Sequence, residues 1–140
     1  MIDIDKLDSW NNTLLVWITN PAAAGRIVSC AKEFALKTGL ELKVVSVQRE
    51  TRDNWEDTLR DLEQLENAAR QSQAELTVVY SDDRLDSAEK LIRSEKPVVM
   101  FAGVPDKGHV NYFAQKLTEE FPYVKLYCVD SDCEVKEYGK

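Results

Sequence analysis

The fold is decided at residues 14–21, which read Leu14-Leu15-Val16-Trp17-Ile18-Thr19-Asn20-Pro21. The first five are apolar without a break, and a run of this length is typical of a strand that is covered on both faces of a sheet. Asn20 can cap a helix, and Pro21 suits the first helical position, where its missing N–H costs nothing. This stretch therefore predicts a buried strand that leads through a short loop into a helix.

The same strand-then-helix pattern continues along the chain. Further apolar strands are expected at residues 42–47, 76–80, 98–102 and 124–129. The first helix should end at Gly39, because glycine readily adopts the left-handed cap conformation. The second is an acidic helix from Asp53 to Arg70, where Asp53 and Glu56 resemble a capping box. Its expected apolar stripe consists of Trp55, Leu59, Leu62, Leu65 and Ala69. Two further helices should end before Pro97 and at Pro122.

Five strands that alternate with four helices predict an α/β fold. Right-handed crossovers then give a three-layer sandwich around a five-stranded parallel sheet, for which we take the strand order 3-2-1-4-5. At 140 residues the chain has the length of one domain. We expect this domain to span residues 1–140, with its core at about 12–130 and a loose polar tail at 131–140.

Charge and cysteine content argue against several classes of protein. The formal net charge of −7 disfavours binding to nucleic acid or to anionic membranes, since both need a basic face. No apolar run approaches the ~20 residues of a membrane-spanning helix, so membrane insertion is not expected. Cys30, Cys128 and Cys133 form no Cys-x-x-Cys pair, which indicates neither a disulfide framework nor a zinc site. Cys30 and Cys128 are interpreted as small core residues, and a cytoplasmic location is the simplest expectation.

A ligand, if it is a small molecule, should bind beyond the carboxyl ends of the strands, between the loops after the first and fourth strands. These loops are residues 19–24 and 103–109. The first lacks the residues of a P-loop, of a Rossmann fingerprint and of a magnesium-binding receiver domain. The second holds Gly103 and Gly108, whose backbone N–H groups would suit an anion, and Lys107 would add charge. A tight strand-to-helix turn explains the same glycines without any ligand.

Catalytic chemistry finds little support. His109 is the only histidine, and no partner that would orient it is evident. Asp82 and Asp83 precede a helix, where they serve more simply as caps than as an acid–base pair. We expect no catalytic residue, no metal ligand and no resident cofactor, so that an enzyme is the minority interpretation. The candidate ligand-binding residues are Thr19, Asn20, Val45, Gly103, Lys107, Gly108 and His109.

Several segments, taken in order, resemble the universal stress proteins, the UspA-like family with a HUP/Rossmann-like fold. Residues 14–21 and 39–47 carry this likeness, which extends over about residues 12–130. Residues 31–35 and 75–83 are closer to the stress-protein-like domain of KdpD-type potassium sensor kinases. The resemblance implies a regulatory domain in stress response or signalling, non-enzymatic and acting through dimerisation or protein contacts.

The likeness breaks down at the nucleotide loop. ATP-binding members of the family carry an aspartate at the end of the first strand, where this chain has Thr19 and Asn20. They also carry Gly-x-x-Gly and a later Gly-Ser or Gly-Thr after the fourth strand. Here Pro105 removes a backbone donor and Asp106 would repel a triphosphate. ATP binding in the usual manner is therefore not expected. The alternative function is a nucleotide sensor (AMP, ATP or a cyclic dinucleotide) that uses the same crevice with other contacts.

Two surfaces are candidates for protein contacts. Members of the family commonly pair through the edge of the fifth strand, and the resemblance implies a homodimer through Val124 to Val129. Pairing there would satisfy the backbone groups of an exposed edge. The acidic helix from Asp53 to Arg70 is a second candidate surface for a protein partner, although a face of mixed charge is usually just solvated.

Overall fold

Strands and helices alternate along the part of the chain that the structure describes. This computed structural model describes residues 12–18, 21–48, 55–103, 112–130 and 133–137. The elements are β1 (Thr13–Trp17), the 3₁₀ helix η1 (Pro21–Ala23), α2 (Ala24–Thr38), β2 (Glu41–Gln48), α3 (Trp55–Gln71), β3 (Glu75–Tyr80), α4 (Arg84–Glu95), β4 (Val99–Gly103), α5 (Tyr112–Glu120), β5 (Lys125–Val129) and β6 (Val135–Glu137).

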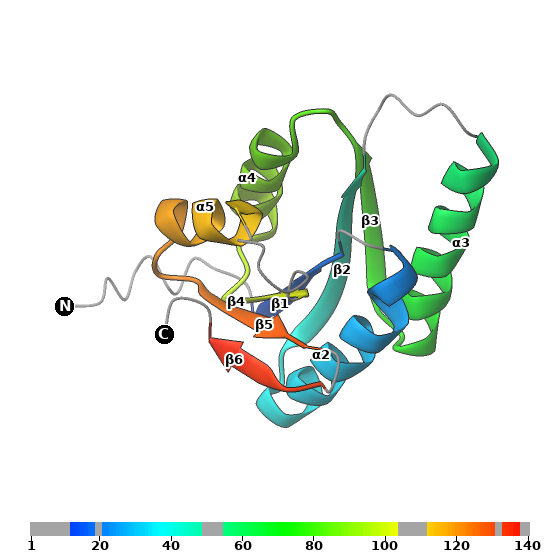
Figure 1. The fold of residues 1–140 in the computed structure, drawn as a ribbon. Helices are drawn as coiled ribbons and strands as arrows, with labels where there is room; N and C mark the ends of the chain where they lie inside the picture. The colour runs from blue at the N-terminus through cyan, green and yellow to red at the C-terminus, as the bar shows by residue number, and fades with distance from the viewer. Residues whose placement is uncertain (1–11, 19–20, 49–54, 104–111, 131–132, 138–140) are drawn as a thin grey trace.

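The strands form one sheet in the order β3-β2-β1-β4-β5-β6 (Figure 1). β1 to β5 are parallel, and β1 lies at the centre, where Val16 is opposite Val44 of β2 and Phe101 of β4. Every residue of β1 is buried, as a central strand covered on both faces requires. The predicted α/β sandwich and the predicted order of the first five strands are confirmed.

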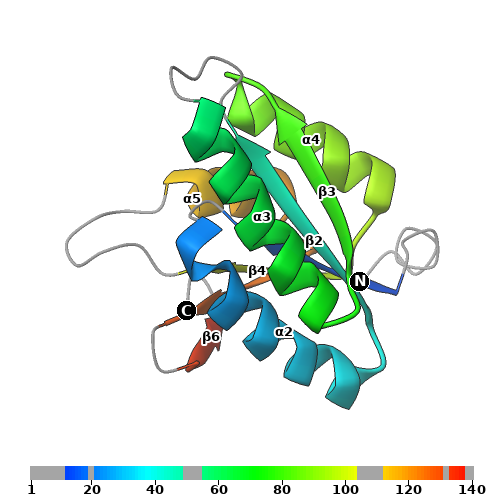
Figure 2. The same cartoon turned by 90° about the vertical axis from the view of Figure 1, so that its right-hand side faces the viewer.

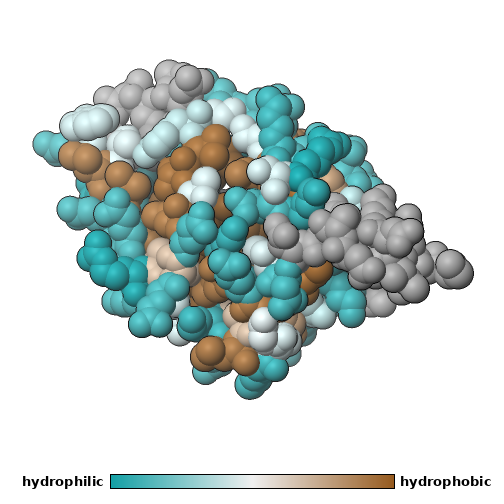
Figure 3. Space-filling view, turned by 180° about the vertical axis from the view of Figure 1, so that it is seen from behind, coloured by the Kyte–Doolittle hydropathy of each residue, from teal (hydrophilic) through white to brown (hydrophobic). Residues whose placement is uncertain are grey.

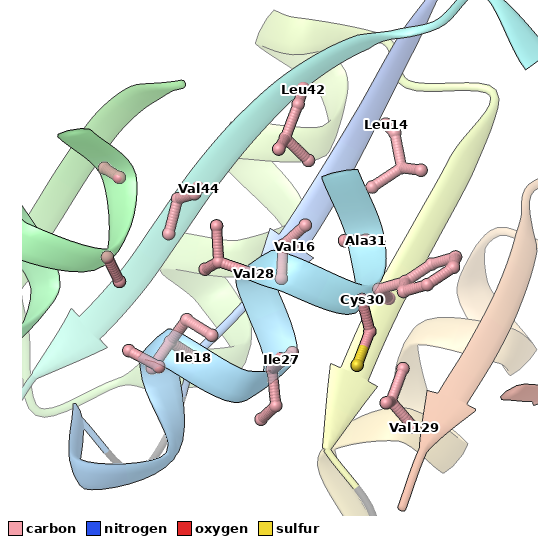
Figure 4. Packing of buried hydrophobic residues seen from close by; sticks show 14 of the residues in the cluster. Leu14, Val16, Ile18, Ile27, Val28, Cys30, Ala31, Leu42, Val44 and Val129 are labelled. Carbon is pink, nitrogen blue, oxygen red and sulfur yellow. The ribbon is translucent and has the colours of Figure 1, made fainter. Parts of the chain in front are cut away.

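Two hydrophobic cores fill the space between the sheet and its helices. Helices α2 and α3 cover one face, and α4 and α5 cover the other (Figures 1 and 2). Because side chains alternate along a strand, Val16 belongs to the α2/α3 core, whereas Leu15 and Trp17 belong to the α4/α5 core. In Figure 4, Val28 of α2 lies close to Val16 in the first of these cores.

The helix ends agree only in part with the expected signals. Gly39 closes α2 in the left-handed conformation, with φ 73°, and its N–H donates to the carbonyl of Ala35, as predicted. Pro21 opens the 3₁₀ turn η1, and the α-helix itself begins at Ala24. Asn20 and Asp53, the two other predicted cap residues, lie outside the described residues. None of the described helices is both long and apolar enough to span a membrane.

The apolar stripe expected along α3 is correct only in its second half. Leu65 and Ala69 are buried in the α2/α3 core, but Trp55 is 72% exposed and Leu59 is 45% exposed. In Figure 1 the first turns of α3 stand farther from β3 than its last turns do. Side chains on these first turns therefore do not reach the core.

The sheet has one strand more than predicted. β6 pairs with β5 in the antiparallel direction, with Val135 opposite Val129 and Glu137 opposite Tyr127. Part of the tail that was expected to be loose therefore turns back and covers β5. The assumption that β5 forms an exposed edge is wrong. A strand of three mixed residues is too short for its alternation to be read from sequence.

The cysteines also differ from expectation. Cys30 of α2 and Cys133 form a disulfide bond, with their Cα atoms 5.9 Å apart. The two residues are 103 positions apart, and no spacing rule connects cysteines at such a distance. Cys30 is a core residue, as predicted, with 5% of its surface exposed. Cys128, the third cysteine, is a free, half-buried thiol.

Candidate functional site

The crevice expected between the loops after β1 and β4 is described on one side. Thr19, Asn20 and residues 107–109, which include Lys107, Gly108 and His109, lie outside the described residues. Val45 of β2 and Gly103 of β4 are described, and Gly103 is the last residue of its strand. The described part of the site therefore consists of the carboxyl ends of β1, β2 and β4 and the start of α2.

Gly103 lets α2 approach the end of β4. A Cβ atom at this position would lie 2.8 Å from Cδ1 of Ile27, which is shorter than the separation of carbon atoms in contact. Ile27 is 4% exposed and belongs to the α2/α3 core. The start of α2 consequently packs closely against the end of β4 through apolar atoms, and the glycine has a packing role independent of any anion.

Val45 contributes its backbone. Its side chain is buried in the α4/α5 core, so it does not face a ligand. Its carbonyl oxygen accepts a hydrogen bond from the N–H of Ile18 at 2.9 Å, immediately after β1 ends. This bond fixes the direction in which the chain enters the loop that begins at Thr19.

Two buried polar side chains on β2 form further hydrogen bonds next to the one between Ile18 and Val45. Ser46 Oγ donates to the carbonyl oxygen of Ile18 at 2.7 Å, and Gln48 Nε2 donates to Ser46 Oγ at 2.6 Å. Both residues are buried, and buried polar groups are retained when they are hydrogen-bonded. Neither was a candidate from sequence. The available signal was their spacing of two in the otherwise apolar second half of the strand, which places both side chains on one face.

The two aspartates after β3 lie in a surface hollow. Asp82, Asp83, Arg84 and Leu85 line this open hollow of about 470 Å³. Asp83 caps α4, since its Oδ1 accepts the N–H of Asp86 at 3.0 Å, and its own N–H donates to Ser81 Oγ at 3.1 Å. The prediction that this segment caps a helix is confirmed for Asp83. A carboxylate engaged in this way is held as a cap and is poorly placed for proton transfer.

Lys43 forms two ion pairs, away from the crevice, that connect β2 with α4 and with β3. Lys43, near the amino-terminal end of β2, has its Nζ 2.7 Å from Glu95 Oε2 of α4 and 3.8 Å from Glu75 Oε2 of β3. The hydrogen bond to Glu95 raises the pKa of Lys43, and this outweighs the lowering effect of desolvation. Within the described part of the chain, no group of three or more His, Cys, Asp or Glu side chains is arranged to hold a metal ion.

Comparison with solved structures places this geometry in a known fold. The universal stress protein from Archaeoglobus fulgidus matches with a TM-score of 0.63 and 18% identity, over 90% of this chain and 98% of its own. The universal stress protein from the same organism in complex with dAMP matches with a TM-score of 0.60 and 18% identity, over 83% and 95%. A universal stress protein in complex with cAMP gives a TM-score of 0.50 and 15% identity, over 75% and 80%.

Sequence comparisons give no match, either to a protein-family model or to a curated protein. At identities below a fifth, the structural likeness defines the fold and leaves the function open. The finer resemblance to KdpD-type sensor kinases is not tested by these structures and stays a prediction. The chain has the fold of the universal stress proteins, with a mostly parallel sheet between two layers of helices.

Proposed function

We propose that this chain is a regulatory domain of the universal-stress-protein type that binds a nucleoside monophosphate beyond the carboxyl ends of β1 and β4. One observation favours the nucleotide sensor among the functions that the sequence leaves open: two structures with this fold are complexes with dAMP and cAMP. Each of these ligands carries one phosphate group. A ligand of low charge also agrees with Pro105 and Asp106 in the loop after β4, which disfavour a triphosphate.

The described residues beside the crevice are apolar, and ligand sites are mostly apolar with a few polar groups that fix orientation. In this proposal the base of the ligand lies on this side, outside the packed contact between Ile27 and Gly103. The phosphate would then lie toward Lys107 and the backbone N–H groups near Gly108. This assignment of the phosphate rests on the sequence, because both residues lie outside the described part.

The proposed role is regulatory rather than catalytic. The binding of the nucleotide would act as a signal that passes to a second copy or to another protein. In this proposal no bond of the nucleotide is broken, so the chain needs no catalytic residue. A cytoplasmic location and a relation to KdpD-type sensors are parts of the same proposal.

Thermal unfolding of the full chain with AMP, dAMP, cAMP and ATP tests this function. A ligand present at 100 times its Kd stabilises the folded state by about 2.7 kcal/mol. We expect at least one monophosphate to raise the Tm by several degrees and to do so at lower concentration than ATP. Identical Tm values with all four nucleotides would contradict the proposal, and a preference for ATP would contradict its charge argument.

A second candidate function, a domain that acts through protein contacts alone, is favoured by exposed apolar side chains on α3. Trp55 and Leu59 are four residues apart, so they lie on the same face of the helix. The strand beside α3, β3, forms one edge of the sheet and is only partly buried. The side of the molecule seen in Figure 3 shows a band of hydrophobic surface surrounded by hydrophilic side chains. Such patches are typical of protein interfaces.

The charge of α3 indicates what such a partner would carry. Between Trp55 and Gln71 the helix has five acidic residues and two arginines, Arg60 and Arg70. A partner with an apolar centre and a basic rim would be complementary to this surface.

This second candidate is tested with the double variant Trp55→Ser, Leu59→Ser. The variant should fold, because both side chains are largely exposed, and it should lose the partner. Glu63→Gln on the same helix is the control for a change of charge alone. A partner recovered from cell extract counts only if, once purified, it binds the unaltered chain and not the double variant. Equal binding to both would exclude this surface.

A further inference from the structure

We propose that the Cys30–Cys133 pair is a reversible redox site, and that its oxidation state decides whether the β5–β6 hairpin is fastened to α2. The bond connects the buried face of a helix to the turn that leads into the last described strand. A reversible thiol–disulfide site at this point would control how firmly β6 covers β5.

The contacts of α2 with the hairpin form a single line. Arg26, Cys30 and Phe34 follow one another at intervals of four residues, so they lie along one face of the helix. Arg26 Nη1 donates to the carbonyl oxygen of Asp130, Cys30 bonds to Cys133, and the ring of Phe34 lies 5.5 Å from that of Tyr127. Figure 4 shows Cys30 on the side of α2 that faces the strand carrying Val129.

The turn is closed by Asp130. Its N–H donates to the carbonyl oxygen of Glu134 and its own carbonyl oxygen accepts the N–H of Cys133, both at 3.1 Å. Its Oδ1 accepts the N–H of Glu134 at 2.9 Å. In hairpin turns with these hydrogen bonds, the residue at the position of Cys133 adopts the left-handed conformation and is most often glycine.

A cysteine occupies the position in this turn that favours glycine. Cys133 has φ 65°, a conformation that costs a residue with a Cβ about 1 kcal/mol. Turn formation alone therefore does not account for this residue type. The disulfide bond to Cys30 accounts for it, which indicates that a cysteine is present at this position because its sulfur atom forms the bond.

Reduction would begin at Cys133, because this residue is exposed whereas Cys30 is 5% exposed. A thiolate of a dithiol reductant attacks Sγ of Cys133, and Cys30 leaves as a thiolate that takes up a proton. The second thiol of the reductant then displaces Cys133, which also takes up a proton. Two electrons and two protons thus pass from the reductant to the two cysteines, and the reductant ends as a disulfide.

Cys128 does not compete with this pair. It lies between Tyr127 and Val129, which both face the α2/α3 core, so its side chain points to the opposite face of the sheet. Burial raises the pKa of the Cys128 thiol, which keeps it in the less nucleophilic protonated form. Exchange within the described chain is therefore confined to Cys30 and Cys133.

Without the bond, few contacts hold β6. The strand has three residues and is partnered on one side, by β5. Arg26 and Asp130 would still hold the start of the turn, and Val135 to Glu137 would rely on the ladder with β5 and on the packing of Val135 against the α2/α3 core. Short edge strands open easily, and opening would expose the backbone groups of β5.

The first experiment places the folded full chain in glutathione buffers from fully oxidised to fully reduced, alkylates free thiols with iodoacetamide and locates the labels by mass spectrometry. Cys30 and Cys133 should change together from unlabelled to labelled, without denaturant, and return on oxidation. Cys128 should label equally in every buffer. A bond that opens only after the chain is unfolded would make it a fixed staple and overturn the proposal, as would free thiols in oxidised buffer.

The second experiment measures amide hydrogen exchange in the oxidised and reduced states. Reduction should speed exchange in β6 and along β5 by about tenfold or more, while β1 stays unchanged as the internal reference. Equal exchange in both states would overturn the fastening role.

Two variants separate the bond from the backbone. Cys133→Gly removes the bond and suits the left-handed turn, and Cys30→Ser removes the bond alone. Both should show fast β6 exchange that no longer responds to reductant, whereas Cys128→Ser should behave like the unaltered chain. A response to reductant in Cys133→Gly would assign the effect to another site. If a variant fails to fold, the reversible oxidation of the unaltered chain still decides the question.

Discussion

At the scale of single residues, Gly103 shows how closely α2 packs against the end of β4. Gly103→Val would push two methyl groups toward Ile27, whose Cδ1 is already 2.8 Å from the position of a Cβ. We expect a loss of about 1–3 kcal/mol in the free energy of unfolding, measured with urea. Gly103→Ala should cost less, since the end of the Ile27 side chain can turn away.

Gly25 is the matched control for that substitution. It lies in the first turn of α2, and a Cβ added there meets nothing within 4 Å. Gly25→Ala should therefore stabilise the chain by about 0.5–1 kcal/mol, because alanine has the better helix propensity. Equal effects of alanine at both positions would show that the contact between Gly103 and Ile27 does not limit packing.

The pair formed by Ser46 and Gln48 makes a second prediction at this scale. Ser46→Ala removes the donor to Ile18 and the acceptor of the Gln48 amide, so it should destabilise by about 1–3 kcal/mol. In a double-mutant cycle with Gln48→Leu, the two losses should sum to more than the loss of the double variant. Strict additivity would contradict a shared network.

At the scale of elements, the ion pair of Lys43 gives a prediction for pH. Its pKa is raised above the ordinary value of 10.5, so its stabilising contribution is complete below that pH. The contribution is lost as the pH rises through the higher pKa of the folded state. Lys43→Met should therefore cost about 1–3 kcal/mol at neutral pH, and its difference from the unaltered chain should shrink in alkaline urea titrations. A difference that stays constant with pH would rule out this linkage.

The elements that sequence predicts well are those with long apolar patterns. The five parallel strands, the cap at Gly39 and the end of α4 before Pro97 follow from local patterns that extend over many residues. The predictions fail where the deciding contact is remote or the segment is short. β6 has three residues, the partner of Cys30 is 103 positions away, and the exposure of Trp55 depends on how α3 is tilted against the sheet.

Sequence locates the strand ends that surround the candidate site, and its assignment of ligand-binding residues stays a prediction. The sequence suggests that the backbone N–H of Gly103 binds an anion, whereas the structure shows that this glycine allows close packing beside Ile27. Ser46 and Gln48 were not predicted, because their spacing of two indicates a shared face of the strand but not the hydrogen bond to the carbonyl of Ile18. Lys107 and His109 remain predictions from sequence.

At the scale of the whole molecule, the position of β6 constrains how two copies can meet. A homodimer through the edge of β5 stays a prediction, and such pairing requires β6 to leave its place. We therefore expect light scattering to show more dimer under reducing conditions and in Cys30→Ser, and mainly the 16.0 kDa monomer when the disulfide is formed. A dimer that persists unchanged in oxidised protein would place the interface elsewhere, with the open edge at β3 as the next candidate.

The most direct test of the proposed function is the binding of dAMP, measured by isothermal titration calorimetry on the unaltered chain, on Lys107→Ala and on Lys116→Ala. The two variants lose the same charge, but Lys116 lies on the exposed side of α5, with its Nζ 3.7 Å from Glu119. We predict binding at one site per chain, about tenfold or more weaker in Lys107→Ala because a charged contact to phosphate is lost, and unchanged in Lys116→Ala. No heat of binding with dAMP, AMP or cAMP, or equal losses in both variants, would contradict a nucleotide site in the crevice.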